Sequence, residues 1–345
     1  MRIVLLLTRN KQTGPQKQTQ YLADVFSREG YDAEIKYVFN NDTPKFFFDK
    51  FPNRLSDIIS LIKFIKYRNP QLVISTGIVP DLFSFFFIFS KVKWFVVIRN
   101  RMSEDYQPKF GKFISKLLVF SHISTFFGVD QIICVSQSVQ KKIGEVTKID
   151  FFKSKTIVIR NSIDFDNCKN VISRGPTHTV MLSATPEPRK NLEFFLNIAQ
   201  SLCSDFPSVQ FNVVGTRPEE VDVCFLAPPN FTFVGFQDLS LSKNWNVDCM
   251  ASASLSEGFP NIVLECLSMG VPALVSEIEP HLEISELSPF VRTFGLEYES
   301  FRDQLNCILC KVEDNTHIQS HSRIEFDTKK AAHSYLSKLQ ELIKP

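Results

Sequence analysis

Residues 254–276 read SLSEGFPNIVLECLSMGVPALVS, with two glutamates, Glu257 and Glu265, on either side of a turn and an apolar run. Glycine can adopt backbone angles that other residues avoid, so Gly258 suits a sharp loop. Pro260 suits the first turn of a helix, where its missing N–H costs no hydrogen bond. A second turn at 270–272 leads into a short apolar strand at 273–275. The segment therefore predicts a loop, a helix and a strand of an α/β fold.

The amino end of this expected helix is a candidate anion site. The backbone N–H groups of Asn261, Ile262 and Val263 would point out of the helix end, beside the positive end of its dipole, where phosphate binds well. Glu265 follows about one turn further in, where its carboxylate could accept hydrogen bonds from sugar hydroxyls. Glu257, in the preceding loop, could face the same ligand. An anion site between two carboxylates suits a sugar nucleotide.

Two glutamates separated by seven residues, around Gly-Phe-Pro-Asn and before Gly-Val-Pro, resemble the donor-site signature of the retaining GT-B glycosyltransferases of family 4, also called glycosyl transferases group 1. The surrounding sequence resembles the bacterial surface-polysaccharide type. The resemblance implies an α/β fold of two Rossmann-like domains that face a cleft. It also implies a donor site made by Glu265, Gly258, Phe259, Pro260, Asn261 and Ile262. The alternative is an ordinary strand-loop-helix-loop-strand unit without a ligand.

Length and composition fit this class of protein. A chain of 345 residues suggests about two domains, and the formal charge of +2 argues against a dedicated nucleic-acid binder. The apolar stretch at 3–7 is too short for a secretory signal. Lys91 and Lys93 end the apolar run 82–89 before it could span a bilayer. The eight scattered cysteines indicate reduced thiols. We expect a cytoplasmic protein that could associate with the membrane at its cytoplasmic face.

The first half of the chain alternates apolar runs with helical patterns, which is typical of a parallel sheet covered by helices. We expect strands at 2–8, 33–38, 71–75, 94–98, 131–135 and 156–160. We expect helices at 16–29, 53–67, 80–90, 109–126 and 137–145. Ligands gather at the carboxyl ends of such strands. The resemblance implies that Gly14 contributes to the donor site and that Gly77, Arg99, Asn100 and Arg101 lie on the acceptor side. Plain turn geometry is the alternative for both glycines.

The resemblance also sets the expected domain boundaries. Residues 132–138 and 156–164 match segments of the family, with Ser162 in place of its usual glycine, and the second of them normally closes the first domain. We therefore expect an acceptor-binding domain at 1–165 and a nucleotide-sugar-binding domain at 176–325. A helix at 326–345 would return to the first domain. Asp164 and Asp166 more simply cap the linker than bind a metal.

The loop at 184–191 carries the expected catalytic cations. Lys190 falls on the lysine with which the family neutralises the donor diphosphate, and Arg189 stands beside it. A cation at a helix start is unfavourable against the dipole unless an anion binds there. The family usually has an arginine five or six positions before this lysine, where this chain has Ala184 and Thr185. Either Arg189 or a basic residue of the first domain substitutes, or the donor is held more weakly.

Two further loops receive weaker assignments. The resemblance implies that the turn after the strand at 231–236, with Gly235 and Phe236, holds the nucleotide base; a simple turn is the alternative. The loop at 277–281 ends in His281, which we interpret as a surface or structural residue. No metal and no cofactor are expected, because cationic side chains and backbone amides would neutralise the leaving group and the nucleotide sugar is itself a substrate.

We therefore predict a hexosyltransferase-type enzyme that moves a sugar, with retention, from a nucleotide-diphosphate sugar. UDP is the expected nucleotide, and Glu257, Lys190 and Arg189 are the expected catalytic residues. The acceptor would be a glycan or lipid-linked oligosaccharide in polysaccharide biosynthesis, as for lipopolysaccharide. One alternative is a donor-binding but catalytically weak partner subunit. An epimerase or phosphorylase would need another acidic or histidine constellation or a cofactor lysine, and a dehydrogenase would need Gly-x-Gly-x-x-Gly after the first strand.

The 34 phenylalanines gather in the first half of the chain, several of them near basic residues. Phenylalanines at 46–48, 83, 85–87 and 89 could dock at an anionic lipid surface. The accompanying cations would be Lys45, Lys50, Lys91, Lys93, Arg99 and Arg101. The alternative is that these phenylalanines form core and the lysines a solvated face.

Overall fold

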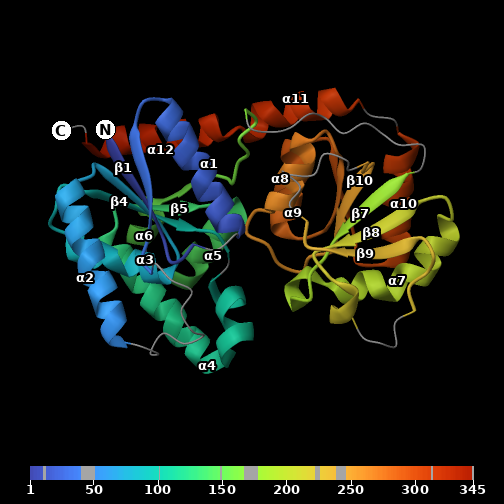
Figure 1. Cartoon of the computed structure of the whole chain (residues 1–345), viewed down its shortest axis with the longest axis horizontal. Coiled ribbons are helices and arrows are strands. Elements are labelled where there is room, and N and C mark those ends of the chain that lie inside the picture. Colours follow the sequence, from blue (N-terminus) through green and yellow to red (C-terminus); the bar gives the residue numbers. More distant parts are fainter. Residues whose placement is uncertain are drawn as a thin grey trace. The chain divides into compact units, whose positions relative to one another are not determined.

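The computed structural model describes residues 1–10, 13–39, 51–100, 102–147, 150–166, 178–221, 226–237, 246–311 and 314–343. The chain divides into two compact units. Unit 1 comprises Met1–Ser162 and Thr328–Pro345, and unit 2 comprises Ile163–Asp327. Each unit contains a parallel sheet of six strands with helices around it (Figure 1). The expected fold class is confirmed.

The sheet of unit 1 has the strand order β2-β1-β3-β4-β5-β6. Its strands are β1 (Arg2–Leu7), β2 (Asp32–Tyr37), β3 (Leu72–Thr76), β4 (Lys93–Ile98), β5 (Gln131–Cys134) and β6 (Thr156–Val158). The central strands are continuous apolar runs because helices cover both faces of a parallel sheet. All six expected strands are confirmed, and none of their ends is shifted by more than two residues.

The helices of unit 1 differ more from expectation. They are α1 (Gly14–Arg28), α2 (Phe51–Arg68), α3 (Ile78–Leu82), η1 (Phe83–Phe87), α4 (Met102–Ser124), η2 (Thr125–Gly128), α5 (Gln137–Thr147), α6 (Asp150–Lys155) and α12 (Thr328–Ile343). The single helix expected at 80–90 is wrong, because α3 ends and a 3₁₀ helix follows. The helix expected from 109 begins earlier, and Gly111, with φ 74° and ψ 170°, interrupts its helical backbone.

A buried polar network ties α3 and α4 to the sheet of unit 1. His122 Nε2 lies 2.7 Å from Asp81 Oδ2, and His122 Nδ1 lies 2.9 Å from the Tyr106 hydroxyl. The Ser75 hydroxyl donates to Asp81 Oδ1 at 2.6 Å, and the Trp94 indole N–H donates to Ser75 at 2.9 Å. Because each group inside has a partner, the network fixes the second half of α4 in a single orientation.

The sheet of unit 2 has the order β12-β11-β10-β7-β8-β9. Its strands are β7 (Thr179–Ser183), β8 (Gln210–Val214), β9 (Phe231–Gly235), β10 (Cys249–Ser252), β11 (Ala273–Ser276) and β12 (Val291–Phe294). Its helices are η3 (Pro188–Lys190), α7 (Leu192–Asp205), η4 (Pro218–Glu220), α8 (Asn261–Ser268), α9 (Glu279–Leu287), α10 (Tyr298–Cys310) and α11 (Asn315–Phe326). Numbered within this unit, the order is the Rossmann pattern 3-2-1-4-5-6, whose direction reverses between β7 and β10.

The chain leaves unit 1 and returns to it at neighbouring points. The Ile163 N–H donates to the carbonyl of Phe326 at 2.8 Å, and Ile163 pairs with Asp327 in an isolated parallel bridge. The final helix, α12, then packs against α1 in unit 1. The expected return of the C-terminal helix to the first domain is confirmed. The contacts divide the chain after Ser162 and after Asp327, where the sequence analysis placed boundaries at 165 and 326.

Within the described ranges, no helix is both long and apolar enough to cross a membrane. The apolar run at 82–89 instead becomes part of α3 and η1, with Phe83 and Phe87 buried in unit 1. The Phe87 ring stacks on Trp94, with centroids 5.6 Å apart. Phe85, Phe86 and Phe89 are exposed. The core interpretation therefore holds for Phe83 and Phe87, whereas docking of the exposed rings at a lipid surface stays a prediction.

Candidate functional site

The loops that follow β7 and β10 meet at the carboxyl edge of the sheet of unit 2. These two strands are neighbours, and their ends form the point where the strand order reverses. The Leu255 N–H, after β10, donates to the carbonyl of Arg189, after β7, at 2.7 Å. In open α/β sheets such a switch point is the usual place for a ligand. The two loops carry the expected catalytic residues.

Lys190, Arg189 and Glu257 form one ion-paired cluster. Lys190 Nζ lies 2.5 Å from Glu257 Oε1, and Arg189 Nη1 lies 3.2 Å from Glu257 Oε2. The Ser254 hydroxyl also donates to Glu257 Oε1, at 3.0 Å. Arg189 makes a second ion pair at 2.9 Å with the largely exposed carboxylate of Glu187. The structure thus brings together all three residues that the sequence nominated as catalytic.

The carboxyl group of Glu257 is held ionised by these partners. Burial by itself would raise its pKa, but the charges of Lys190 and Arg189 and the hydrogen bond from Lys190 outweigh burial, so the pKa is lowered. The Glu257 side chain is 9% exposed, whereas those of Lys190 and Arg189 are 16% and 36% exposed. A buried carboxylate therefore positions two cations that keep part of their surface open to an incoming anion.

The helix that begins beside this cluster is α8. It starts at Asn261, with Pro260 in extended backbone as its N-cap, and the Leu264 N–H makes the first turn back to the Pro260 carbonyl. The N–H groups ahead of Leu264 have no acceptor within the helix, as at any helix start. Gly258 lies at a bend in the loop before the helix, as expected, although it does not use the positive φ that glycine allows. Gly258 and Phe259 are buried, and Phe259 packs against Phe326 with ring centroids 6.3 Å apart.

Glu265 lies on the half-buried side of α8. It follows Asn261 by four residues, so the two side chains share one face of the helix. Both are half-buried, whereas Val263, Leu264 and Cys266 are buried in unit 2. Ile262, the remaining expected donor residue of the helix start, is also half-buried. The solvent-facing stripe of α8 therefore begins at the helix amino end and includes Glu265.

A buried histidine lies behind the charge cluster. His281 is 0% exposed, and its Nδ1 lies 2.9 Å from the Ser276 carbonyl, which can only accept. Burial lowers the pKa of His281 to about 4, although Glu257 acts to raise it. The ring is therefore neutral, with its proton on Nδ1, and Nε2 finds no hydrogen-bond partner among the described residues. Of the two interpretations of His281, surface or structural, its burial excludes the first.

A chain of hydroxyls connects His281 to the cluster, and the sequence analysis missed it. The Ser276 hydroxyl donates to the Ser254 carbonyl at 2.5 Å, and the hydroxyls of Ser252 and Ser254 lie 3.0 Å apart. The available signal was the serines at the ends of the two strands that became β10 and β11. Small polar residues in buried strand ends indicate a polar interior at that edge of the sheet.

The structure explains why no arginine stands at position 184. Ala184 is 1% exposed and belongs to the apolar core of unit 2. Its N–H donates to Val214 and its carbonyl accepts from the Thr216 hydroxyl at 2.9 Å. A Cβ on Gly215 would lie 2.7 Å from the same carbonyl. A long cationic side chain at position 184 would point into this core, so the second cation of the cluster is Arg189.

Gly235 and Phe236 form the turn after β9. Gly235 has φ +66°, and a Cβ there would lie 3.2 Å from Cγ of Arg217, in the loop after β8. The Gly215 N–H donates to the Gly235 carbonyl at 2.8 Å, which joins the two loops. Phe236 is 67% exposed. The sequence analysis did not select Arg217, an exposed cation beside this turn.

The residues of unit 1 that the sequence analysis expected to line the site are two glycines and the segment 99–101. Gly77, with φ +100°, follows β3, and Gly14 begins α1 after β1, so both lie where the strand order of this sheet reverses. Arg99 is committed to internal partners: its Nη1 donates to Asn161 Oδ1 at 3.0 Å and its Nη2 to Thr19 at 3.5 Å. Burial lowers the pKa of Arg99 to about 10.

The other residues of this expected surface are only partly described. Asn100 is half-buried, and Arg101 lies outside the described residues. Lys45, Lys50 and the phenylalanines at 46–48 also lie outside them. Among the described side chains of the whole chain, no group of three metal-binding residues lies close enough to hold an ion. Asp166, of the linker, pairs with Arg323.

Comparisons with known proteins bear directly on unit 2. Residues 177–288 match the family model of glycosyl transferases group 1. This stretch contains the charge cluster, α8 and His281. In sequence, the chain is 22% identical over 275 residues to an uncharacterized glycosyltransferase, MJ1059, of Methanocaldococcus jannaschii. The alignment covers 70% of this chain and 66% of that protein, just under two thirds of its length.

Solved structures with the same fold cover the whole chain. Anabaena Alr3699/HepE in complex with UDP has a TM-score of 0.74 at 14% identity, covering 99% of this chain and 100% of that one. Sucrose-phosphate synthase from Thermosynechococcus elongatus has a TM-score of 0.71 at 13% identity, covering 99% of each chain. At these identities the likeness shows the fold, which is GT-B. The family match, the relative and the fold together support a glycosyltransferase, an enzyme that transfers sugar residues.

Proposed function

We propose that the protein transfers a sugar, with retention, from a nucleotide-diphosphate sugar to a glycan or lipid-linked oligosaccharide in the assembly of a surface polysaccharide. The observation that carries this proposal is the charge cluster of Lys190, Arg189 and Glu257 beside the amino end of α8. Two cations beside the amino end of a helix, at one switch point, suit a diphosphate.

In the proposed reaction, the bond between the anomeric carbon of the sugar and the β-phosphate oxygen breaks, and the acceptor oxygen bonds to the same face of that carbon. The acceptor proton passes to the leaving diphosphate. Negative charge therefore develops on the diphosphate, and positive charge develops on the sugar. Lys190, Arg189 and the first amides of α8 would stabilise the diphosphate, and preorganised charges of this kind are worth most where water is excluded.

The two glutamates have different proposed roles. Glu257 holds Lys190 and Arg189 in place before the donor binds, since all three already form ion pairs. Its carboxylate would also lie near the sugar and stabilise the positive charge on the anomeric carbon. Glu265, one turn into α8, would accept hydrogen bonds from the ribose hydroxyls. No enzyme nucleophile is assigned, because the leaving phosphate itself would guide the acceptor to the same face.

We propose UDP as the nucleotide, held at its base by the turn of Gly235 and Phe236. The Anabaena protein has been solved with UDP and also with UDP-glucose, which makes uridine nucleotides the first ligands to test. The exposed ring of Phe236 could stack on a base. Arg217, beside Gly235, would contribute a further positive charge near the nucleotide.

The absence of an arginine at 184 and 185 supports a second candidate, a donor-binding partner subunit with weak activity. We favour the enzyme because Arg189 already shares Glu257 with Lys190 and can supply the missing charge. Loss of one charge-assisted contact to a diphosphate would cost about 1.5–3 kcal/mol, which weakens a site without abolishing it.

The test begins with thermal-shift screening of the full chain against UDP-, GDP- and ADP-sugars, because a bound ligand raises the unfolding temperature. Turnover of the selected radiolabelled donor is then measured with a panel of glycan and lipid-linked acceptors. Transfer with the anomeric configuration retained would support the proposal. Donor binding without transfer to any acceptor would favour the subunit, and no stabilisation by any nucleotide sugar would contradict both.

A further inference from the structure

We propose that the second half of α4 in unit 1 docks at an anionic lipid surface. Four large apolar side chains are exposed along this segment: Phe113 at 84%, Ile114 at 49%, Leu117 at 62% and Phe120 at 72%. Lys112 and Lys116 stand among them and are exposed as well. We call these six residues the α4 face. Since a helical stripe of this kind normally packs against a core, its exposure indicates a missing partner.

The fold of unit 1 fixes this face outward. Gly111 breaks the helical backbone at the start of the segment, so its direction is independent of the first half of α4. Ser115 is buried, and His122 is buried and hydrogen-bonded to Asp81. Two polar residues of the segment, Ser115 and His122, therefore face inward, whereas its four large apolar residues face water. This arrangement reverses that of an ordinary surface helix.

The positive charge of the segment favours an anionic partner. Residues 106–129 contain no aspartate or glutamate. Lys112 and Lys116 form no ion pair with the described side chains of unit 1. The carboxylate in the neighbouring turn of α5, Glu145, is already paired with Lys142 at 2.9 Å. The α4 face therefore presents positive charge without compensation from the described carboxylates around it.

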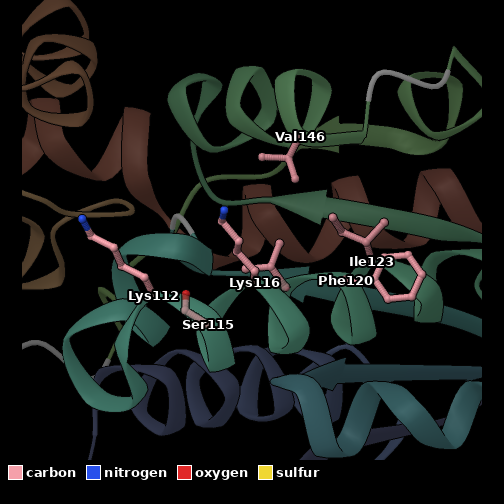
Figure 2. A pocket seen from close by; sticks show the side chains of 7 residues that line it. Lys112, Ser115, Lys116, Phe120, Ile123 and Val146 are labelled. Atoms are coloured by element: carbon pink, nitrogen blue, oxygen red, sulfur yellow. The ribbon is translucent and has the colours of Figure 1, made fainter.

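A pocket beside the α4 face adds a place for an apolar chain. It has a volume of about 460 Å³ and lies between α4 and Val146 of α5 (Figure 2). Its other lining residues are Lys112, Ser115, Lys116, Val119, Phe120 and Ile123. In Figure 2 the two lysines extend from α4 on the side that faces Val146, at one end of the pocket. An apolar floor with ammonium groups at one end matches an acyl chain with an anionic head group.

A second copy of the chain fits this face less well. A two-fold symmetric contact would bury the same face of both copies, and with it Lys112 and Lys116 of each copy. The segment offers no carboxylate to pair with them, so the contact would bury like charges. A lipid leaflet accepts the aromatic and aliphatic side chains at the level of its head groups and pairs the ammonium groups with phosphates. Charge complementarity thus favours the membrane surface.

The experiment is cosedimentation of the full chain with two kinds of vesicles, phosphatidylcholine alone and an equimolar mixture with phosphatidylglycerol. We expect binding to the mixed vesicles and little to the neutral ones. Replacing both lysines, Lys112→Gln with Lys116→Gln, should lower the partition coefficient by about fivefold for each lysine. Leu117→Glu should lower it at least about tenfold, because an apolar contact becomes a like charge. High salt should weaken the binding.

The control is Ile324→Glu, a matched change at an exposed apolar residue of α11 in unit 2, where the side chain is 70% exposed. This variant should bind vesicles like the wild type. Circular dichroism checks that each variant remains folded, and the lysine pair tests the proposal even if Leu117→Glu does not fold. Equal binding to both vesicles, or unchanged binding after either α4 change, would overturn the proposal. So would a dimer that Leu117→Glu dissociates while vesicle binding persists.

Discussion

The two units have similar sheets, yet their switch points are built from different chemistry. In unit 2 the loops after β7 and β10 bring Lys190, Arg189 and Glu257 into one half-buried ion cluster. In unit 1 the corresponding edge carries two glycines, and the cation after β4, Arg99, is turned toward Asn161 and Thr19. The first arrangement keeps charge available to a ligand, whereas the second uses charge to hold the unit together.

This difference shows which of the two proposed substrates, the donor or the acceptor, can be inferred from the residues of the chain. A diphosphate demands fixed positive charge, and only a few side chains can supply it at a given sheet edge. Sugar acceptors are bound by many weak and varied contacts, which leave no comparable signature. The residues of unit 2 therefore indicate how the proposed donor would bind, whereas the acceptor has to be identified by experiment.

The largest effect on stability should come from Glu257→Ala in unit 2. Removing this carboxylate breaks the ion pairs of both Lys190 and Arg189 in a partly buried site and leaves Arg189 only its pair with the exposed Glu187. We expect a loss of about 3 kcal/mol in the free energy of unfolding, at the low end for a broken buried ion pair because both cations retain contact with water. Denaturant titration measures it. Glu286→Ala, at an exposed position of α9, is the control and should change little.

The buried histidine should make the stability of unit 2 depend on pH. Burial lowers the pKa of His281 to about 4, below the ordinary value of 6.5 that applies in the unfolded chain. As the pH falls through this interval, His281 takes up a proton in the unfolded chain but stays neutral in the folded protein. The free energy of unfolding should therefore fall by about 2 kcal/mol between roughly pH 7 and pH 5 from this residue.

His281→Gln separates this contribution from the rest of the chain. The variant should lose most of the slope of stability against pH in that interval, measured by denaturant titration at several pH values. Glu257 does not obscure the result, because its lowered pKa places its own loss of stability at lower pH. Identical slopes for the variant and the wild type would show that His281 titrates normally.

Glu265→Ala should weaken donor binding without comparable damage to the fold. The side chain is half-buried on α8, and the proposal assigns it to the ribose. Loss of a hydrogen bond to an ionised group costs about 1.5–3 kcal/mol, so the donor dissociation constant should rise at least about tenfold. Calorimetric titration with the donor measures it, again with Glu286→Ala alongside. Unchanged affinity would remove Glu265 from the donor site.

The smallest effect on stability and on donor affinity is expected from a substitution in unit 1. Arg99→Ala removes two hydrogen bonds but also a desolvated charge, so the net loss of stability should be only about 1 kcal/mol. Donor affinity should stay at the wild-type value, because Arg99 contacts Asn161 and Thr19 within its own unit. A strong fall in donor affinity would show that Arg99 contributes to donor binding, which would contradict the proposed difference between the two switch points.

Much of the fold followed from the sequence because its signals are local. Buried parallel strands are short apolar runs, and all six strands of unit 1 lie where such runs occur. The interruption of α4 was not predicted, since a single glycine, Gly111, is compatible with both a continuous and a broken helix. The division of residues 83–89 into buried and exposed phenylalanines also depends on packing that no local pattern contains.

The candidate site could be predicted only where its geometry depends on a single continuous segment of the chain. The motif around α8 and the Lys190 loop predicted that these two loops form the candidate site, but not that Glu257 would pair with both cations. That contact joins residues 67 and 68 positions apart. The hydrogen bonds around His281 likewise involve Ser276 of β11 and Ser254 after β10, which become neighbours only in the folded sheet. Side-chain partners across the sheet are a tertiary property.

The central claim is that Lys190 and Arg189 bind the diphosphate of the donor. The most direct measurement compares, by calorimetry, the affinities for the nucleoside diphosphate chosen in the screen and for its parent nucleoside. The exposed-surface variant Arg302→Ala of α10 serves as the control. The wild type and this control should bind the diphosphate far more tightly, and Lys190→Met with Arg189→Met should abolish most of that preference. A double variant that keeps the full preference would contradict the account.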